Sequence, residues 1–283
     1  MNENLPPKAP AIKDWLRSAA NQLAAAGISS AKLDAEIILA HTLRENRTYL
    51  HAHDDEPLSP RRLEIADARL QLRIDRTPIA YIVGHKEFYG RLFRVNPSTL
   101  IPRPESEMII TILKELTAQS TLGLDPSPHR LVDVGTGTGC LGISAKLELP
   151  ELEVTLLDVS RHALKIAETN AKWLHAKVTV TRSDLLQAYP LVADYIIANL
   201  PYVDPEWQRS PETNFEPALA LFADDAGLAL INKLIEQAPS RLNPGGYLLL
   251  EADPRQHAAI IKTAKLQGFS LHSIQDFIVV LQK

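Results

Sequence analysis

The sequence predicts an α/β fold, in which helices cover both faces of a mostly parallel sheet, joined to a small helical bundle. From residue 130 onward, short apolar runs alternate with amphipathic stretches of helical length, a pattern typical of parallel strands with crossover helices. Before residue 85, apolar residues recur only at helical spacing. The chain has 283 residues, of which 45% are hydrophobic, and this is enough for one large and one small domain.

The first domain, residues 1–84, is predicted to be helical, and the family resemblance described below implies that it is the substrate-recognition domain. Apolar residues lie at helical spacing over 12–23 and again over 33–43, and Gly27 between them is a suitable stop. A third helix is predicted to begin at Pro60, because a missing N–H has no cost in the first helical turn.

Residues 85–104 are predicted to form a β-hairpin and a linker, followed by a large domain over 105–283. In the hairpin, aromatic and β-branched residues flank a glycine. The large domain is predicted to begin with a helix over 105–117. Further strands are expected over 130–135, 154–159, 177–184, 194–199, 246–253, 269–274 and 277–282, and further helices over 139–148, 161–174, 226–239 and 255–267. A turn is predicted over 243–246, and the last two strands are expected to form an antiparallel edge.

Composition and charge exclude several classes of protein. A net charge of −4 and a pI of 6.1 argue against a dedicated nucleic-acid binder, whose affinity depends on basic residues. No apolar run approaches the ~20 residues of a membrane helix, and the opening segment shows no secretory signal. The single cysteine, Cys140, fits a reducing cytoplasm. His51 and His53 lie between two helices, where we expect a solvated loop and no metal site.

A glycine-rich motif follows the first strand of the large domain and opens a helix. Its residues are Gly135, Thr136, Gly137, Thr138 and Gly139. Glycines allow a tight turn and a close approach of a ligand, and the helix start offers unpaired N–H groups. Asp158 ends the next strand, where an acid can accept hydrogen bonds from a ribose diol. The motif therefore predicts a cofactor that contains a nucleoside.

Two cofactors are compatible with this motif. A G-x-G-x-x-G match favours an NAD-linked dehydrogenase, but it begins two residues after Gly135, which itself comes directly off the strand. S-adenosyl-L-methionine is preferred, because Asp133 at the strand end suits a cationic amine better than a pyrophosphate. The next strand ends in Asp184, a candidate acceptor for the adenine amino group, and in Leu185, a candidate packing surface for the adenine ring.

The fourth strand ends in Asn199, Leu200, Pro201 and Tyr202. The Asn199 side-chain oxygen can accept one hydrogen of a planar NH₂ group, and the Leu200 carbonyl can accept the other. Pro201 fixes the chain without a competing N–H, and Tyr202 can lie against a flat π system. These features indicate methyl transfer to an amino nitrogen and argue against a scaffold protein that only binds the cofactor.

Together the motifs resemble the HemK/PrmC family, the glutamine-N5 methyltransferases of peptide chain release factors. The resemblance is carried by EFYGRLFRVNPSTLIPRPESE, LVDVGTGTG, LLDVS, DYIIANLPYVD, FEPALALFADDAGL and NPGGYLLLE, within residues 87–251. It implies a class I (Rossmann-like) methyltransferase with a seven-stranded, mostly parallel sheet. It also implies S-adenosyl-L-methionine as donor and the glutamine of the release-factor Gly-Gly-Gln loop as acceptor.

The resemblance implies roles for individual residues. It implies that the methyl donor is contacted by Gly135–Gly139, Asp158, Leu185 and Asn199. It also implies that the glutamine amide is held by Asn199–Tyr202. Leu100 and the segment Pro102–Glu105 line the approach, and the N-terminal helices help to bind the release factor. The family tetrapeptide is normally Asn-Pro-Pro-Tyr, so Leu200 departs from it while keeping the carbonyl. The position of Leu185 is often aromatic in relatives, and a Gly- and Arg-containing loop before the last strand is missing here.

Other acceptors stay open at this point. A related family methylates a glutamine of a ribosomal protein, but it typically breaks the Pro-Arg-Pro-Glu segment that is intact here. Asn-Leu-Pro-Tyr is similar to the motif of ribosomal RNA adenine-N6 dimethylases, so an adenine-N6 methyltransferase acting on nucleic acid is a further alternative. We expect a cytoplasmic monomer that acts on a protein and contacts neither nucleic acid nor a membrane.

Overall fold

The computed structural model of the chain describes residues 9–119 and 129–283, so residues 1–8 of the opening segment lie outside it. The chain divides into two compact units. The first comprises Met1–Gly84 together with Ser210–Phe215, and the second comprises His85–Arg209 together with Glu216–Lys283. Over the described ranges, no helix is both long enough and apolar enough to cross a membrane.

The first unit is built from helices. They are α1 (Ile12–Ala25), α2 (Ala31–Leu43), α3 (Arg47–Ala52), α4 (Pro60–Ile74) and α5 (Ile79–Val83), with the 3₁₀ helix η3 (Pro211–Phe215) from the separate segment. The helix predicted to begin at Pro60 does so, and the Ser59 side chain caps it by accepting from the backbone N–H of Arg62. Trp15, Leu23 and Ile38 lie in one buried core between these helices.

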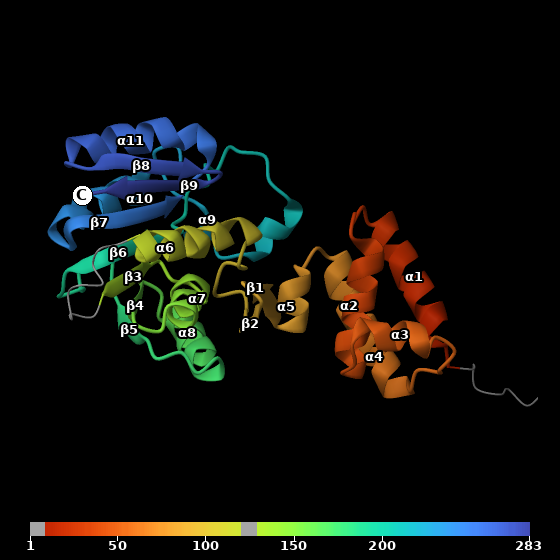
Figure 1. Ribbon diagram of the computed structural model, residues 1–283. Helices are drawn as coiled ribbons and strands as arrows, with labels where there is room; N and C mark the ends of the chain where they lie inside the picture. Colours follow the sequence, from red (N-terminus) through yellow and green to blue (C-terminus); the bar gives the residue numbers. More distant parts are fainter. Residues whose placement is uncertain (1–8, 120–128) are drawn as a thin grey trace, which may run out of the picture. The chain divides into compact units, whose positions relative to one another are not determined.

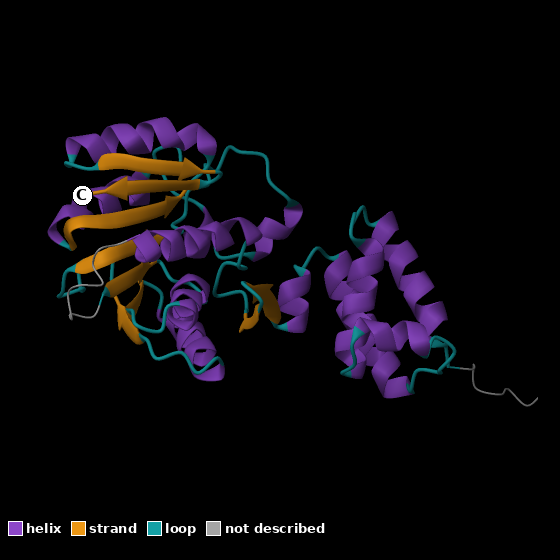
Figure 2. Ribbon diagram, viewed as in Figure 1, coloured by secondary structure: helices purple, strands orange, loops and turns teal. Residues whose placement is uncertain are grey.

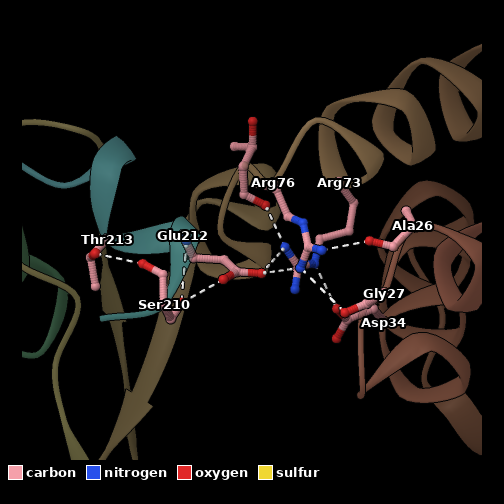
Figure 3. Close-up of polar contacts among 9 residues, drawn as sticks. Ala26, Gly27, Asp34, Arg73, Arg76, Ser210, Glu212 and Thr213 are labelled. Carbon is pink, nitrogen blue, oxygen red and sulfur yellow. Dashed lines mark hydrogen bonds and ion pairs between the residues drawn. The ribbon is translucent and has the colours of Figure 1, made fainter. Parts of the chain in front are cut away.

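A charged network holds the segment Ser210–Phe215 on the helices of this unit (Figure 3). Arg73 of α4 is buried. Its Nε donates to Asp34 of α2 at 2.7 Å, and its Nη1 donates to Glu212 at 3.2 Å. Arg76 donates to the same Glu212 oxygen at 3.3 Å. Burial opposes the charged form of Glu212, but hydrogen bonds and the two arginines lower its pKa to about 2. The carboxylate is therefore charged at neutral pH.

The second unit begins with the predicted hairpin of β1 (His85–Phe88) and β2 (Arg91–Arg94). Its strands continue with β3 (Arg130–Val134), β4 (Glu153–Asp158), β5 (Thr179–Arg182), β6 (Ala193–Ala198), β7 (Leu242–Glu251), β8 (Ser270–Gln275) and β9 (Ile278–Gln282). Its helices are η1 (Pro104–Ser106), α6 (Glu107–Gln119), α7 (Cys140–Glu148), α8 (Arg161–Trp173), α9 (Ala218–Leu221), α10 (Ala229–Gln237), η4 (Ala238–Ser240), η5 (Pro254–Gln256) and α11 (His257–Leu266).

Strands β3 to β9 form a seven-stranded sheet in the order β5-β4-β3-β6-β7-β9-β8 (Figure 1). Strand β9 runs antiparallel to β7 and β8, and the other neighbours are parallel, which confirms the predicted fold class. Successive residues of a strand point to opposite faces, so Tyr195 and Ile197 of β6 pack with α6, α7 and α8. Ile196 and Ala198 pack on the other face with α10 and α11. Helices therefore cover both faces of the sheet (Figure 2).

One sequence-based expectation about the last strands differs from the structure, and the expected antiparallel edge is confirmed. The predicted turn at 243–246 lies inside β7, which begins at Leu242. Leu242 pairs with Ala193 and Tyr247 with Tyr195, so β7 is held to β6 on both sides of this stretch, and the register shifts across it. The missing family loop leaves the edge complete, because β8 and β9 pair directly from Ser270 opposite Gln282.

Candidate active site

The order of the strands places the two sequence motifs side by side. The chain runs from β3 outward to β4 and β5, and then returns to β6 on the other side of β3. Ligands bind at such a switch point, in the crevice beyond the carboxyl ends of the strands. Val134 of β3 pairs with Ala198 of β6. Gly135 and Asn199, which follow these residues, therefore begin the two loops that leave neighbouring strands at the same edge.

A cavity of about 370 Å³ lies at this edge, within the second unit. The lining residues from the predicted site are Gly135, Thr136, Gly137, Thr138, Asp158, Asp184, Leu185, Asn199, Leu200 and Pro201. Two further segments close the cavity and contribute Ser98, Thr99, Leu100, Pro102, Arg103 and Ser106 on one side and Pro217, Leu219 and Ala220 on the other. Of the predicted residues, Gly139, Tyr202, Pro104 and Glu105 are not part of the lining.

The glycine loop is fixed from the sheet side and from the acceptor side. Gly135 has φ +71°, and a Cβ added there would lie 2.7 Å from Cδ2 of Leu200. Only glycine adopts this conformation at low cost and leaves room for the leucine. Leu200 is buried, so the residue that departs from the family tetrapeptide packs against the first glycine of the donor loop.

The buried side chain of Asp133 stabilises the glycine loop by accepting hydrogen bonds. Its Oδ2 accepts from the Thr136 hydroxyl at 2.5 Å and from the backbone N–H of Gly142 at 2.9 Å. Burial raises the pKa of Asp133 to about 6, against these two hydrogen bonds. The side chain does not line the cavity, so the expectation that it faces a cationic group of the ligand is wrong. Its acceptor oxygen holds the loop and the start of α7 together.

The acids at the ends of β4 and β5 have different surroundings. Asp158 accepts from the backbone N–H groups of Gly137 at 2.9 Å and Ser160 at 2.8 Å, and burial raises its pKa. Each carboxylate oxygen has further lone pairs for a diol at the cavity wall. Asp184 instead accepts from the Lys233 ammonium at 2.7 Å, a partner that the sequence motif does not show. Leu185 beside it is buried against the core and also lines the cavity.

The acceptor motif after β6 rests on a second layer of polar groups. The Asn199 Nδ2 donates to the Ser106 hydroxyl at 2.9 Å. The Tyr202 hydroxyl donates to Glu251 at 3.2 Å, and burial together with this carboxyl raises the pKa of the phenol. Tyr202 packs at the border of the core. Sequence reasoning missed Ser106 and Glu251, because both are distant from the motif along the chain.

Glu216 is a further residue that shapes the cavity. Its carboxylate accepts from the backbone N–H of Ile101 at 3.0 Å and from Arg103 Nη2 at 2.5 Å. It is buried, and Pro217 directly after it lines the cavity. This acid lies within an otherwise apolar stretch, FEPALAL, and its hydrogen bonds hold the segment at the cavity.

The composition of the lining tests which cofactor the site fits. Among the described residues of the lining, Arg103 is the only basic side chain, and its charge is paired with Glu216. A pyrophosphate would meet little positive charge there. An acid at a strand end, a glycine loop with no side chains at its turns, and an apolar residue at Leu185 fit a nucleoside cofactor without phosphate. These residues therefore fit S-adenosyl-L-methionine.

Comparison with known proteins identifies the family of the chain. Residues 14–84 match the model of the PrmC N-terminal domain, and residues 112–213 match that of the methyltransferase small domain. A release factor glutamine methyltransferase of Koribacter versatilis is 36% identical over 253 residues, 86% of this chain and 88% of its own length. One of Escherichia coli is 35% identical over 260 residues, 90% of each chain. A solved methyltransferase from Pyrococcus furiosus shares the fold, with a TM-score of 0.52, 19% identity, and coverage of 77% of this chain and 97% of the other.

The fold and the site define a class I methyltransferase that uses S-adenosyl-L-methionine as methyl donor. At this level of identity and coverage, the chain belongs to the release factor glutamine methyltransferase family.

Proposed function

We propose that the protein transfers a methyl group from S-adenosyl-L-methionine to the side-chain nitrogen, N5, of the glutamine in the Gly-Gly-Gln loop of peptide chain release factors. One observation carries this proposal: the donor-type glycine loop after β3 and the amide-binding motif after β6 line one cavity at neighbouring strand ends. The names of the relatives, at 35–36% identity over most of both chains, support the same acceptor.

For the donor, we propose that Gly135–Gly139 let the cofactor approach the backbone closely, and that Asp158, which already accepts from the backbone N–H of Gly137, also accepts from the ribose diol. Asp184 and Leu185 would lie at the adenine, with Leu185 against the ring. When bound, S-adenosyl-L-methionine supplies an electrophilic methyl group on its sulfonium. The role of this chain is to hold that methyl group beside Asn199, which lines the same cavity.

For the acceptor, we propose that Asn199 Oδ1 and the Leu200 carbonyl each accept one hydrogen of the glutamine NH₂ group. Asn199 Nδ2 already donates to Ser106, which leaves Oδ1 as the group available on the cavity side. Two acceptors fix the plane of the amide and direct its nitrogen at the methyl donor. Positioning of this kind can contribute on the order of 7–11 kcal/mol to a barrier when the geometry is ideal.

The experiment is methyl transfer from labelled S-adenosyl-L-methionine to a release factor, to a large-subunit ribosomal protein and to ribosomal RNA, each assayed separately. We expect label on the release-factor glutamine, and we expect it to be lost with Asn199→Ala. Asn232→Ala is the matched control, because Asn232 lies on α10 and does not line the cavity. Label confined to the ribosomal protein or the RNA, or absent from all three, would overturn the proposal.

We further propose that the helical unit recognises the release factor outside the Gly-Gly-Gln loop, as the match of residues 14–84 to the PrmC N-terminal domain suggests. We also propose that the protein is a monomer, and a substrate that acts in translation favours the cytoplasm. If the helical unit recognises the release factor, hydrogen exchange measured with and without release factor would show protection in α1 to α4. Light scattering after gel filtration measures the oligomeric state.

A further inference from the structure

A buried acid lies behind the amide-binding motif, and the roles proposed above do not use it. Glu251 is the last residue of β7 and is 2% exposed. Ala198 of β6 pairs with Leu250, so Glu251 at the end of β7 lies opposite Asn199, the residue that follows β6. Its Oε1 accepts from the Tyr202 hydroxyl at 3.2 Å, and its Oε2 forms no well-shaped hydrogen bond with any described residue. An acid that is costly to bury calls for an explanation.

Ser106 connects this acid to the side chain that faces the cavity. Its hydroxyl oxygen accepts from Asn199 Nδ2 at 2.9 Å. Burial raises the pKa of Glu251, while hydrogen bonding to Ser106, Tyr202 and Asn199 lowers it. Hydrogen bonding therefore favours the charged form of this carboxyl, while burial, the largest effect, opposes it.

The chemistry of a carboxylate sets the direction of every hydrogen bond in this cluster. A charged carboxylate only accepts, so the Tyr202 hydroxyl donates to Glu251, and in the arrangement proposed below the Ser106 hydroxyl directs its proton toward the same carboxylate. Because the Ser106 proton is then used toward Glu251, the Ser106 oxygen acts toward Asn199 only as an acceptor. It accepts from the NH₂ group of the Asn199 amide. The amide oxygen is thereby left for the cavity. With the amide reversed, its NH₂ group would meet the hydrogens of the substrate NH₂ group, and no hydrogen bond could form.

We propose that Glu251 is a positioning residue, the acceptor-only end of a hydrogen-bond chain through Ser106 that turns the Asn199 oxygen toward the glutamine amide. Through its second contact it also holds the Tyr202 hydroxyl away from the cavity. The inference rests on the proposed function, since it assigns the reason why Asn199 can accept from an NH₂ group. A buried hydrophobic residue would fill the same space but could not fix this direction.

The charge of Glu251 makes the orientation depend on pH. Other charged and titratable groups that interact with this cluster are Glu105, Arg103, Asp253 and Cys140. The pKa of Glu251 in the folded protein is raised above 4.5. As the pH falls, Glu251 therefore becomes protonated at a higher pH than an ordinary glutamate. A protonated carboxyl can donate as well as accept, so the direction of the chain is no longer fixed. We expect kcat to fall with decreasing pH through the folded pKa of Glu251.

The decisive variant is Glu251→Gln, which keeps the shape but can donate and accept. We expect kcat on the release factor to fall about ten- to a hundredfold, the range for a misplaced reacting group, with an unchanged Kd for S-adenosyl-L-methionine. The acid limb of kcat should disappear. Glu236→Gln, an exposed acid of α10, is the matched control and should keep the wild-type kcat and pH profile. Ser106→Ala, which leaves the carboxylate but breaks the chain, should also lower kcat.

A second readout needs no substrate. In the protein labelled with ¹⁵N-asparagine, the Asn199 side-chain amide signals should shift as the pH crosses the folded pKa of Glu251. The shift should be absent in Glu251→Gln and in Ser106→Ala. Wild-type protein that shows this titration without methylating the release factor would contradict the proposed function alone. Glu251→Gln with wild-type kcat and acid limb, or an Asn199 signal that does not follow pH in the wild type, would overturn the positioning role.

Discussion

The contact between Leu200 and Gly135 yields a prediction that joins the two halves of the site. Gly135→Ala introduces a methyl group 2.7 Å from Leu200 Cδ2, at a backbone φ of +71°. Leu200→Ala removes the side chain that occupies this space. We expect each single substitution to destabilise the second unit, and the double substitution to cost clearly less than the sum of the two. In the double variant, the methyl group added at position 135 would occupy space that the leucine has left.

The magnitudes follow from the geometry. A left-handed φ costs a residue with a Cβ about 1–2 kcal/mol, and crowding in a packed site adds roughly 1–3 kcal/mol. Truncation of a buried leucine costs about 2–5 kcal/mol, and Leu200 is 4% exposed. In the double variant the crowding term vanishes while the φ term stays. The coupling free energy should therefore be about 1–3 kcal/mol in favour of the double variant.

Urea denaturation followed by circular dichroism measures these free energies of unfolding, and the transition of the helical unit is an internal reference. Gly245→Ala is the matched control, since Gly245 has φ +79° and an added Cβ there has no neighbour within 4 Å. It should show the φ cost alone and no coupling to Leu200→Ala. Strict additivity of Gly135→Ala and Leu200→Ala, within about 0.5 kcal/mol, would refute the packing argument.

Three further predictions concern single residues. Asp158→Asn should weaken binding of S-adenosyl-L-methionine by calorimetry on the order of 10–100-fold, as a charged acceptor is lost, and unchanged affinity would exclude its proposed ribose contact. Leu185→Phe should tighten the same binding about 2–10-fold if the ring stacks on adenine, and weaker binding would contradict that placement. Glu212→Gln should destabilise the helical unit by about 1–2 kcal/mol at pH 7, since the carboxylate is partly exposed and its attraction to Arg73 and Arg76 is screened. Because the folded pKa of Glu212 is lowered from 4.5 to about 2, this difference should shrink as the pH falls through that interval, and an equal difference in urea at pH 7 and pH 3 would contradict the ion pair.

The fold and the cavity-lining residues were largely predictable because their signals are local. Apolar runs of strand length, a glycine loop directly after one, and an amide motif after another fix the order of the elements and the edge where they meet. The start of β7 was not predictable, because glycines at 243–246 signal a turn locally, while the pairing of Leu242 with Ala193 extends the strand beyond them. The sequence shows that Asp133 lies at the end of a strand, but not on which face of the sheet its side chain lies. Val132 and Val134 pack on the side of α10, so the acid between them points to the side of α7.

The second layer of the site was not predictable for a different reason. Ser106, Asn199 and Glu251 come from η1, the end of β6 and the end of β7, and only the sheet register brings them together. Taken singly, each is an ordinary polar residue at the end of an element. Their chemistry appears only in combination, because an amide has two nearly identical ends and cannot choose between them by shape. A neighbouring group that can only accept hydrogen bonds fixes which end of the amide faces it. A carboxylate is the side chain with that property. A carboxylate beside an amide that must accept is one arrangement that makes this choice, and the raised pKa of Glu251 shows that burial works against its charged form.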